Sequence, residues 1–127
     1  MFVLLVVDDS PAICASIRKR LSGFSTLVRL IEVHSLEQAR EVLERQSVNC
    51  VVLDLQLPDG SGYSLCEQLL SRRPHPDVLV FTAHTNPLIK NRCLASGAAG
   101  FYDKVGEAEA FFGQLESIIR EQQWPEQ

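Results

Sequence analysis

Short apolar runs alternate with segments of helical periodicity along this chain. The runs are Phe2–Val7, Leu27–Val33, Cys50–Leu53, Asp77–Ala83 and Gly100–Asp103. Runs of this length, rich in aliphatic and β-branched residues and bounded by Asp, Pro or Gly, are typical of strands. The first run is uninterrupted, as in a central parallel strand covered on both faces. Arg29 and Glu32 interrupt the second run, which favours a strand at the edge of a sheet.

Helix signals lie between these runs. Ser10 followed by Pro11, and Asn86 followed by Pro87, are typical of an N-cap with proline at the first helical position. Ser35 and Gln38 form a capping box. A third helix is expected over Tyr63–Arg72, and the last begins near Glu107. The first helix is expected to stop near Gly23 and the fourth at Gly97.

Five strand and helix pairs with short connections predict a doubly wound α/β fold: a parallel sheet with helices on both faces and right-handed crossovers. In such sheets ligands bind beyond the carboxyl ends of the strands, where the strand order reverses. For the order 2-1-3-4-5, this point lies between the first and third strands. The chain has 127 residues, 46% of them hydrophobic, which fits one domain over 1–123 with a tail at 124–127.

The net charge and the spacing of the cysteines indicate which classes of partner and site to expect. The net charge is −4, so the basic footprint of a nucleic-acid-binding protein is missing. The first apolar run is too short to span a membrane and follows no basic segment, so we expect a cytoplasmic protein with no membrane partner. The four cysteines (Cys14, Cys50, Cys66 and Cys93) have no zinc-ligand spacing and are expected to be reduced and mostly buried. His34 and His75 are expected to be surface residues rather than ligands.

Polar residues end four of the five predicted strands. Asp8 and Asp9 follow the first, Asp54 the third, and Thr82 and Lys104 lie at the ends of the fourth and fifth. Clustered carboxylates repel one another unless a cation lies between them. Mg²⁺ suits such a cluster because it prefers oxygen ligands and is usually held by one or two carboxylates together with a phosphate. The lysine and the hydroxyl would then donate to phosphoryl oxygens, and one carboxylate would act as nucleophile.

The chain resembles the receiver domains of two-component response regulators from Val3 to about Gln122. The motifs that carry the likeness are VVDDS (6–10), LDLQLPDGSG (53–62), FTAH (81–84) and GAAGFYDK (97–104). The resemblance implies the flavodoxin-like form of the doubly wound fold. It also implies a phosphoacceptor rather than an enzyme that acts on external substrates.

By this resemblance, Asp54 accepts a phosphoryl group from a sensor histidine kinase, a phosphotransfer protein or a small phosphodonor. Asp8, Asp9, Asp54 and the backbone carbonyl of Gln56 would hold Mg²⁺, with Asp8 acting through water. Lys104 would bind the phosphoryl group.

The resemblance also implies a switch. Thr82 would move towards the phosphate while Phe101 turns inward. The surface formed by the fourth helix, fifth strand and fifth helix would then change its effector partner.

The sequence departs from the family pattern after Lys104, where many members have a cis proline and this chain has Val105. A non-proline cis bond costs about 2.5 to 4 kcal/mol, which favours a trans bond here. His84 and Gln56 flank the phosphate site and are expected either to tune hydrolysis of the acyl phosphate or to be plain solvated loop residues. Asp59 is expected to serve the turn.

Rival functions remain open from the sequence. An aspartyl-phosphate phosphatase of the haloacid dehalogenase type would carry a second acid where Gln56 stands. A flavin carrier would want a phosphate cradle rich in glycine and hydroxyl groups, which these loops lack. A degenerate receiver would bind partners without phosphorylation. The cognate kinase, a longer parent protein with an output domain, and pairing of two copies through the last helices stay undecided.

Overall fold

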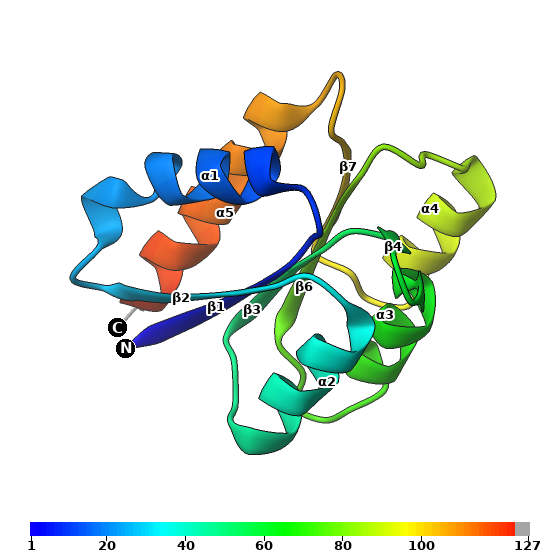
Figure 1. Ribbon diagram of the computed structural model, residues 1–127, viewed down its shortest axis with the longest axis horizontal. Coiled ribbons are helices and arrows are strands. Elements are labelled where there is room, and N and C mark those ends of the chain that lie inside the picture. The colour runs from blue at the N-terminus through cyan, green and yellow to red at the C-terminus, as the bar shows by residue number, and fades with distance from the viewer. Residues whose placement is uncertain (124–127) are drawn as a thin grey trace.

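A five-stranded parallel sheet runs through the middle of the protein (Figure 1). The computed structural model describes residues 1–123, so the predicted tail lies outside the described residues. The strands are β1 (Phe2–Val7), β2 (Val28–Val33), β3 (Cys50–Leu53), β6 (Asp77–Thr82) and β7 (Gly100–Asp103). Their order in the sheet is β2-β1-β3-β6-β7. The predicted doubly wound order and the edge position of β2 are confirmed.

Helices cover both faces of the sheet. Figure 1 shows α1 (Pro11–Arg20) and α5 (Ala108–Gln123) on one side, and α2 (Leu36–Arg45), α3 (Gly62–Leu70) and α4 (Pro87–Ala95) on the other. Successive residues of a strand point to opposite faces, so Leu4 and Val6 of β1 pack beneath α1 and α5 while Leu5 and Val7 pack beneath the other helices. Burial on both sides explains why β1 is apolar throughout.

The predicted helix caps form as the sequence indicates. The side chains of Ser10, Ser35 and Asn86 each accept a hydrogen bond from a backbone N–H in the first turn of α1, α2 and α4. The Gln38 side chain reaches one residue further back than in a standard capping box, to the backbone N–H of His34. Gly97 has a φ of 111° after α4, a backbone conformation that favours glycine at a helix end.

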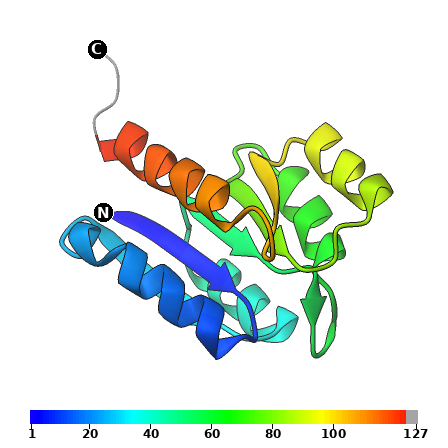
Figure 2. The same ribbon diagram turned by 90° about the horizontal axis from the view of Figure 1, so that it is seen from above.

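Three local features differ from the sequence predictions. The turn after Asp54 contains a small antiparallel hairpin, β4 (Gln56–Leu57) and β5 (Gly60–Ser61), which projects from the fold in Figure 2. Strands of two residues are too short to show alternation in sequence. The third helix ends at Leu70 instead of Arg72, and α1 ends at Arg20 with a 3-10 turn, η1 (Ser22–Phe24), behind it.

Asp59 has a wider role than the turn it was expected to serve. Its two carboxylate oxygens accept hydrogen bonds from the backbone N–H groups of Leu36 and Glu37, at 2.9 and 3.0 Å. These groups open α2, so the hairpin turn caps a helix that lies more than twenty residues earlier in the chain. The two backbone hydrogen bonds lower the pKa of Asp59.

The sheet register brings the strand ends to one edge. Val7 of β1 pairs with Leu53 of β3, Leu53 pairs with Val80 of β6, and Thr82 pairs with Asp103 of β7. The residues that follow these strands therefore gather at the carboxyl edge of the sheet. All four cysteines are free and buried, as predicted. Within residues 1–123, no helix is long and apolar enough to cross a membrane.

Candidate phosphoacceptor and metal site

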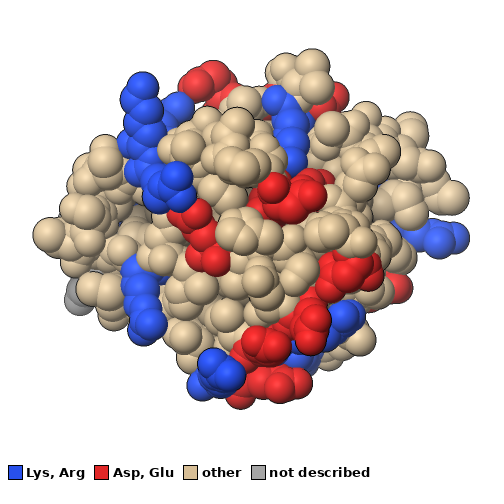
Figure 3. Space-filling model, viewed as in Figure 1, with Lys and Arg blue, Asp and Glu red and all other residues tan. Residues whose placement is uncertain are grey.

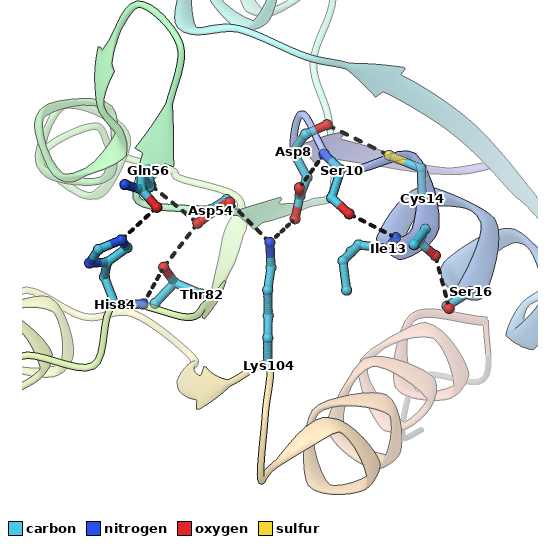
Figure 4. A network of polar contacts seen from close by, with 11 residues as sticks. Asp8, Ser10, Ile13, Cys14, Ser16, Asp54, Gln56, Thr82, His84 and Lys104 are labelled. Atoms are coloured by element: carbon cyan, nitrogen blue, oxygen red, sulfur yellow. Dashed lines mark hydrogen bonds and ion pairs between the residues drawn. The ribbon is translucent and has the colours of Figure 1, made fainter.

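Asp54 lies at the centre of the carboxyl edge, with both side-chain oxygens engaged. Its Oδ1 accepts hydrogen bonds from the Thr82 hydroxyl at 2.9 Å and from the backbone N–H of Gln56 at 3.1 Å (Figure 4). Its Oδ2 lies 3.0 Å from Nζ of Lys104. The side chain is 6% exposed. The donors therefore fix the orientation of a nearly buried carboxylate.

Lys104 connects the first and third strands of the predicted site. Its Nζ lies 2.8 Å from Oδ2 of Asp8 as well as 3.0 Å from Oδ2 of Asp54 (Figure 4). Burial opposes the charge on Lys104, but the hydrogen bonds with both carboxylates outweigh it and raise the lysine pKa. The peptide bond to Val105, whose isomer the sequence left undecided, is trans: the cis bond within residues 1–123 is Arg73–Pro74.

Asp8 is fully buried and incompletely satisfied. Its Oδ1 accepts a hydrogen bond from the backbone N–H of Ser10 at 2.8 Å. Its Oδ2 has the ion pair with Lys104 and no further hydrogen bond among the described residues. Burial raises the pKa of Asp8, although Lys104 and Ser10 counteract that effect. A buried carboxylate oxygen with spare acceptor capacity is suited to a cation or its water.

Three carboxylates converge on this point. Ligand oxygens of Asp8, Asp9 and Asp54 lie within 4.8 Å of one another. Asp9 is exposed, and with Asp54, Gln56 and Lys104 it lines an open cavity of about 410 Å³. An all-oxygen donor set with one lysine for three carboxylates fits Mg²⁺. The role of the Gln56 backbone carbonyl as a ligand of Mg²⁺ stays a prediction.

The remaining predicted residues are His84, Gln56 and Phe101. His84 donates its backbone N–H to the Thr82 hydroxyl at 3.2 Å, and its ring contacts the Gln56 side chain (Figure 4). Both side chains are exposed, and their effect on hydrolysis stays a prediction. Phe101 is 5% exposed and packs in the core that α3 and α4 share with the sheet. The aromatic ring is thus turned inward here.

Sequence reasoning missed the role of Gly62. A Cβ atom at this position would overlap the backbone carbonyl oxygen of Asp54 and lie 3.1 Å from Cα of Leu55. Gly62 also donates its N–H to the carbonyl of Leu55 at 2.9 Å. Because Gly62 has no side chain, α3 can begin in direct contact with the backbone of Asp54, the predicted phosphoacceptor. The glycine in the DGSG motif was the available signal.

A family model described as the response regulator receiver domain matches residues 4–116. The chain belongs to this family. Among curated relatives, this receiver domain is 29% identical over 125 residues to the protein-glutamate methylesterase/protein-glutamine glutaminase of Azospirillum brasilense, covering 92% of this chain and 32% of that protein. It is 30% identical over 104 residues to the DNA-binding transcriptional activator DevR/DosR of Mycobacterium tuberculosis, covering 82% of this chain and 48% of that one. The chain thus spans about a third to a half of these relatives.

Solved structures show the same fold. The non-phosphorylated HemR receiver domain of Leptospira biflexa has a TM-score of 0.81 and 27% identity, covering 94% of both chains. The signal receiver domain of a DNA-binding response regulator from Colwellia psychrerythraea has a TM-score of 0.83 at 17% identity, covering 94% of this chain and 99% of that one. The second likeness supports the fold alone.

Charge is mixed over the surface of this receiver domain. On the face drawn in Figure 3, several basic side chains gather at the upper left, and acidic side chains form a band at the lower right with a few basic side chains beside it. The chain carries 16 acidic against 12 basic residues. Electrostatic attraction on this face therefore comes from local groups rather than from one extended basic field.

Proposed function

We propose that this receiver domain is a phosphoacceptor switch in which Asp54 takes a phosphoryl group from the phosphohistidine of a sensor histidine kinase or phosphotransfer protein. The observation that carries the proposal is the setting of Asp54. Its carboxylate is held by Thr82, Lys104 and a backbone N–H, beside two further carboxylates with which it could share a cation. Phosphoryl transfer needs mainly positioning and charge neutralisation.

The chemical step replaces one bond to phosphorus with another. A carboxylate oxygen of Asp54 attacks the phosphorus atom, the phosphorus–nitrogen bond of the donor breaks, and its electron pair stays on the departing imidazole. The hydrogen bonds from Thr82 and Gln56 orient the carboxylate for this attack. Lys104 supplies positive charge where the phosphoryl oxygens arrive.

Asp8, Asp9 and Asp54 would hold the Mg²⁺ that the reaction requires. When bound, Mg²⁺ neutralises the charge of the carboxylates and of the incoming phosphoryl oxygens. Its absence would leave Lys104 alone to offset three carboxylates and a phosphate. We therefore expect transfer to depend on the metal.

The switch follows from the hydrogen bonds of Thr82. Phosphorylation turns the carboxylate of Asp54 into an acyl phosphate and adds phosphoryl oxygens that are stronger acceptors. The hydroxyl of Thr82 then moves its hydrogen bond to the phosphate, and the backbone N–H of His84 moves with it. This shifts the segment that leads into α4 and gives Phe101, in the core beside α4, a second packing arrangement.

The surface of α4, β7 and α5 is the proposed reader of this change. Leu88 and Leu94 on α4 are 58% and 41% exposed, and Val105 after β7 is 86% exposed. Exposed apolar side chains near a moving segment suit a contact with an effector protein or effector domain. The protein would turn over only its own phosphate, since Gln56 stands where a phosphatase would need a second acid.

Intact-mass spectrometry after incubation with acetyl phosphate and Mg²⁺ tests the proposal. Wild type should gain the mass of one phosphoryl group, and it should fail to do so after chelation of Mg²⁺. The Asp54→Asn variant should gain nothing. Asp103→Asn is the matched control, because Asn keeps an acceptor for the N–H of Val105, and it should gain the phosphoryl mass like wild type.

Two outcomes would contradict the proposal. Wild type that stays unmodified by acetyl phosphate and also by a phosphorylated histidine phosphotransfer domain would indicate a degenerate receiver. A phosphoryl mass gain that persists in Asp54→Asn would place the acceptor elsewhere.

A further inference from the structure

Three potential metal ligands meet on the α1 side of the sheet, apart from the carboxylates of the phosphoacceptor site. They are Cys14 of α1, Glu32 of β2 and His34 just after β2. One ligand atom of each lies within 4.8 Å of the other two. No spacing in the sequence predicts this group, because the cysteine comes eighteen residues before the glutamate.

The fold explains why these side chains meet. Alternate residues of a strand share a face, and the even-numbered residues Val28 and Leu30 of β2 pack in the core that also contains Cys14. Glu32 and His34 continue that series at the carboxyl end of the strand. The first turns of α1 cover the same face, and Cys14 is 2% exposed. Cys14 and Glu32 are therefore held by two regular elements, and His34 follows directly after β2.

We propose that Cys14, Glu32 and His34 form a binding site for a zinc-class divalent ion. Thiolate, imidazole and carboxylate together are typical ligands of Zn²⁺, whereas Mg²⁺ prefers oxygen ligands alone. Tetrahedral zinc with bonds of about 2.0 to 2.3 Å places its ligands roughly 3.3 to 3.8 Å apart. Closing from separations of at most 4.8 Å needs side-chain shifts on the order of 1 Å, within the reach of small rotamer changes. Three protein ligands leave a fourth position for water or a partner's side chain.

Glu32 already has the support that metal-binding carboxylates usually receive. Arg18 lies on the same helix as Cys14, one turn further on, and its guanidinium contacts both oxygens of Glu32 at 2.6 and 2.7 Å. A carboxylate oxygen has two lone pairs, so Glu32 can keep Arg18 and bind an ion. Such hydrogen bonds behind a ligand orient it towards the metal.

Cys14 provides the ligand that selects the metal. Its thiol donates a weak hydrogen bond to the backbone carbonyl of Asp8 at 3.7 Å (Figure 4). Burial raises the pKa of the thiol, and Glu32 and Asp8 add to that effect, so the metal-free protein holds a neutral thiol at neutral pH. Binding then releases one proton to solvent as the sulfur–metal bond forms.

Access to the site runs through His34. This residue is exposed, and its ring makes no hydrogen bond among the described residues. Its backbone is fixed by Gln38 at 2.7 Å. The ring can therefore rotate to bind an ion that arrives from solvent. Cys14 lies deeper, in the core.

Absorption spectroscopy with Co²⁺ as a zinc substitute tests the site on the full chain. The protein is first stripped with a chelator and reduced, then titrated with Co²⁺ in a large excess of Mg²⁺, which occupies Asp8, Asp9 and Asp54. One equivalent of Co²⁺ should produce a thiolate-to-cobalt charge-transfer band and the strong visible bands of tetrahedral cobalt. Zn²⁺ should then displace it.

Two variants locate the ligands. His34→Gln alters an exposed side chain and should fold, yet weaken binding by at least about tenfold, since even the loss of a supporting residue behind a ligand costs that much. Cys14→Ala should abolish the charge-transfer band. His75→Gln is the matched control, because His75 lies beyond α3, near Gly97, and it should bind like wild type.

The proposal is overturned if Co²⁺ gives no charge-transfer band, or if the band survives unchanged in His34→Gln. Binding that disappears in the excess of Mg²⁺ would also overturn it, because the ion would then belong to the carboxylates. None of these readouts depends on phosphorylation of Asp54.

Discussion

The hydroxyl of Thr82 joins Asp54 to the segment before α4. It donates to Oδ1 of Asp54 at 2.9 Å and accepts the backbone N–H of His84 at 3.2 Å. Thr82 is fully buried, so its hydroxyl has no access to water and keeps both of these partners. One hydroxyl therefore relays the state of the carboxylate to the backbone of the next loop.

Thr82→Val should loosen that loop. Valine keeps the volume but leaves the His84 N–H without an acceptor and Asp54 with one donor fewer at Oδ1. An unsatisfied buried group costs about 1 to 3 kcal/mol. Amide hydrogen exchange should show faster exchange at His84, by about fivefold or more for a local loss of 1 kcal/mol, and urea unfolding should show lower stability. Thr82→Ser keeps the hydroxyl, and wild-type protection at His84 in both variants would contradict the relay.

Mg²⁺ should stabilise the wild-type protein against heat. A ligand at a hundred times its dissociation constant adds about 2.7 kcal/mol to the free energy of unfolding. Asp9→Asn removes one of the clustered carboxylates. Without Mg²⁺ it should be at least as stable as wild type, because like charges repel less, and with Mg²⁺ its Tm should rise far less. Scanning calorimetry over a Mg²⁺ series measures both effects.

Asp103→Asn serves as the charge control for that experiment. It changes the net charge equally but leaves the three-carboxylate cluster intact. Its Tm should follow the wild-type Mg²⁺ series. An equal loss of the Mg²⁺ response in both variants would show that total charge, rather than a site at Asp9, governs the effect.

The α2 cap should give a pH-dependent contribution to stability. The hydrogen bonds from Leu36 and Glu37 lower the folded-state pKa of Asp59 below its ordinary 3.8. Its contribution is therefore fully present above pH 3.8 and is lost as the pH falls through the lower folded value. Asp59→Ala should unfold at a lower urea concentration than wild type at neutral pH, and the two midpoints should converge in acid. A gap that stays constant with pH would mean that the charge of Asp59 does not stabilise the cap.

Substitution by alanine should lower the free energy of unfolding at Gly62 and raise it at Gly113. At Gly62 the new Cβ would overlap the carbonyl of Asp54, which should cost about 1 to 3 kcal/mol and weaken Mg²⁺ binding by displacing the Asp54 backbone. Gly113 lies on an exposed face of α5 with nothing within 4 Å of a new Cβ, so alanine should stabilise by up to about 1 kcal/mol. Urea unfolding measures the stability of both variants. Equal changes in stability would contradict the close approach at Gly62.

The sequence predicted the strands and caps because their causes are local. Continuous apolar runs such as Phe2–Val7 can be satisfied only by burial on both faces, and Ser10 with Pro11 satisfies the first N–H groups of the helix it begins. The predicted residues Asp8, Asp54, Thr82 and Lys104 meet because each directly ends a parallel strand. Once the sheet order follows from the alternation, their proximity follows as well.

Tertiary structure alone decided two contacts: the cap that Asp59 places on α2, and the meeting of Cys14 with Glu32 and His34. Each joins atoms whose distance depends on how a whole helix or turn packs on the sheet, and no short-range pattern encodes that distance. The sequence by itself determined which elements form and which chemistry ends each strand. Packing decided which of the remaining polar groups face one another, because those contacts are set by the relative placement of rigid elements.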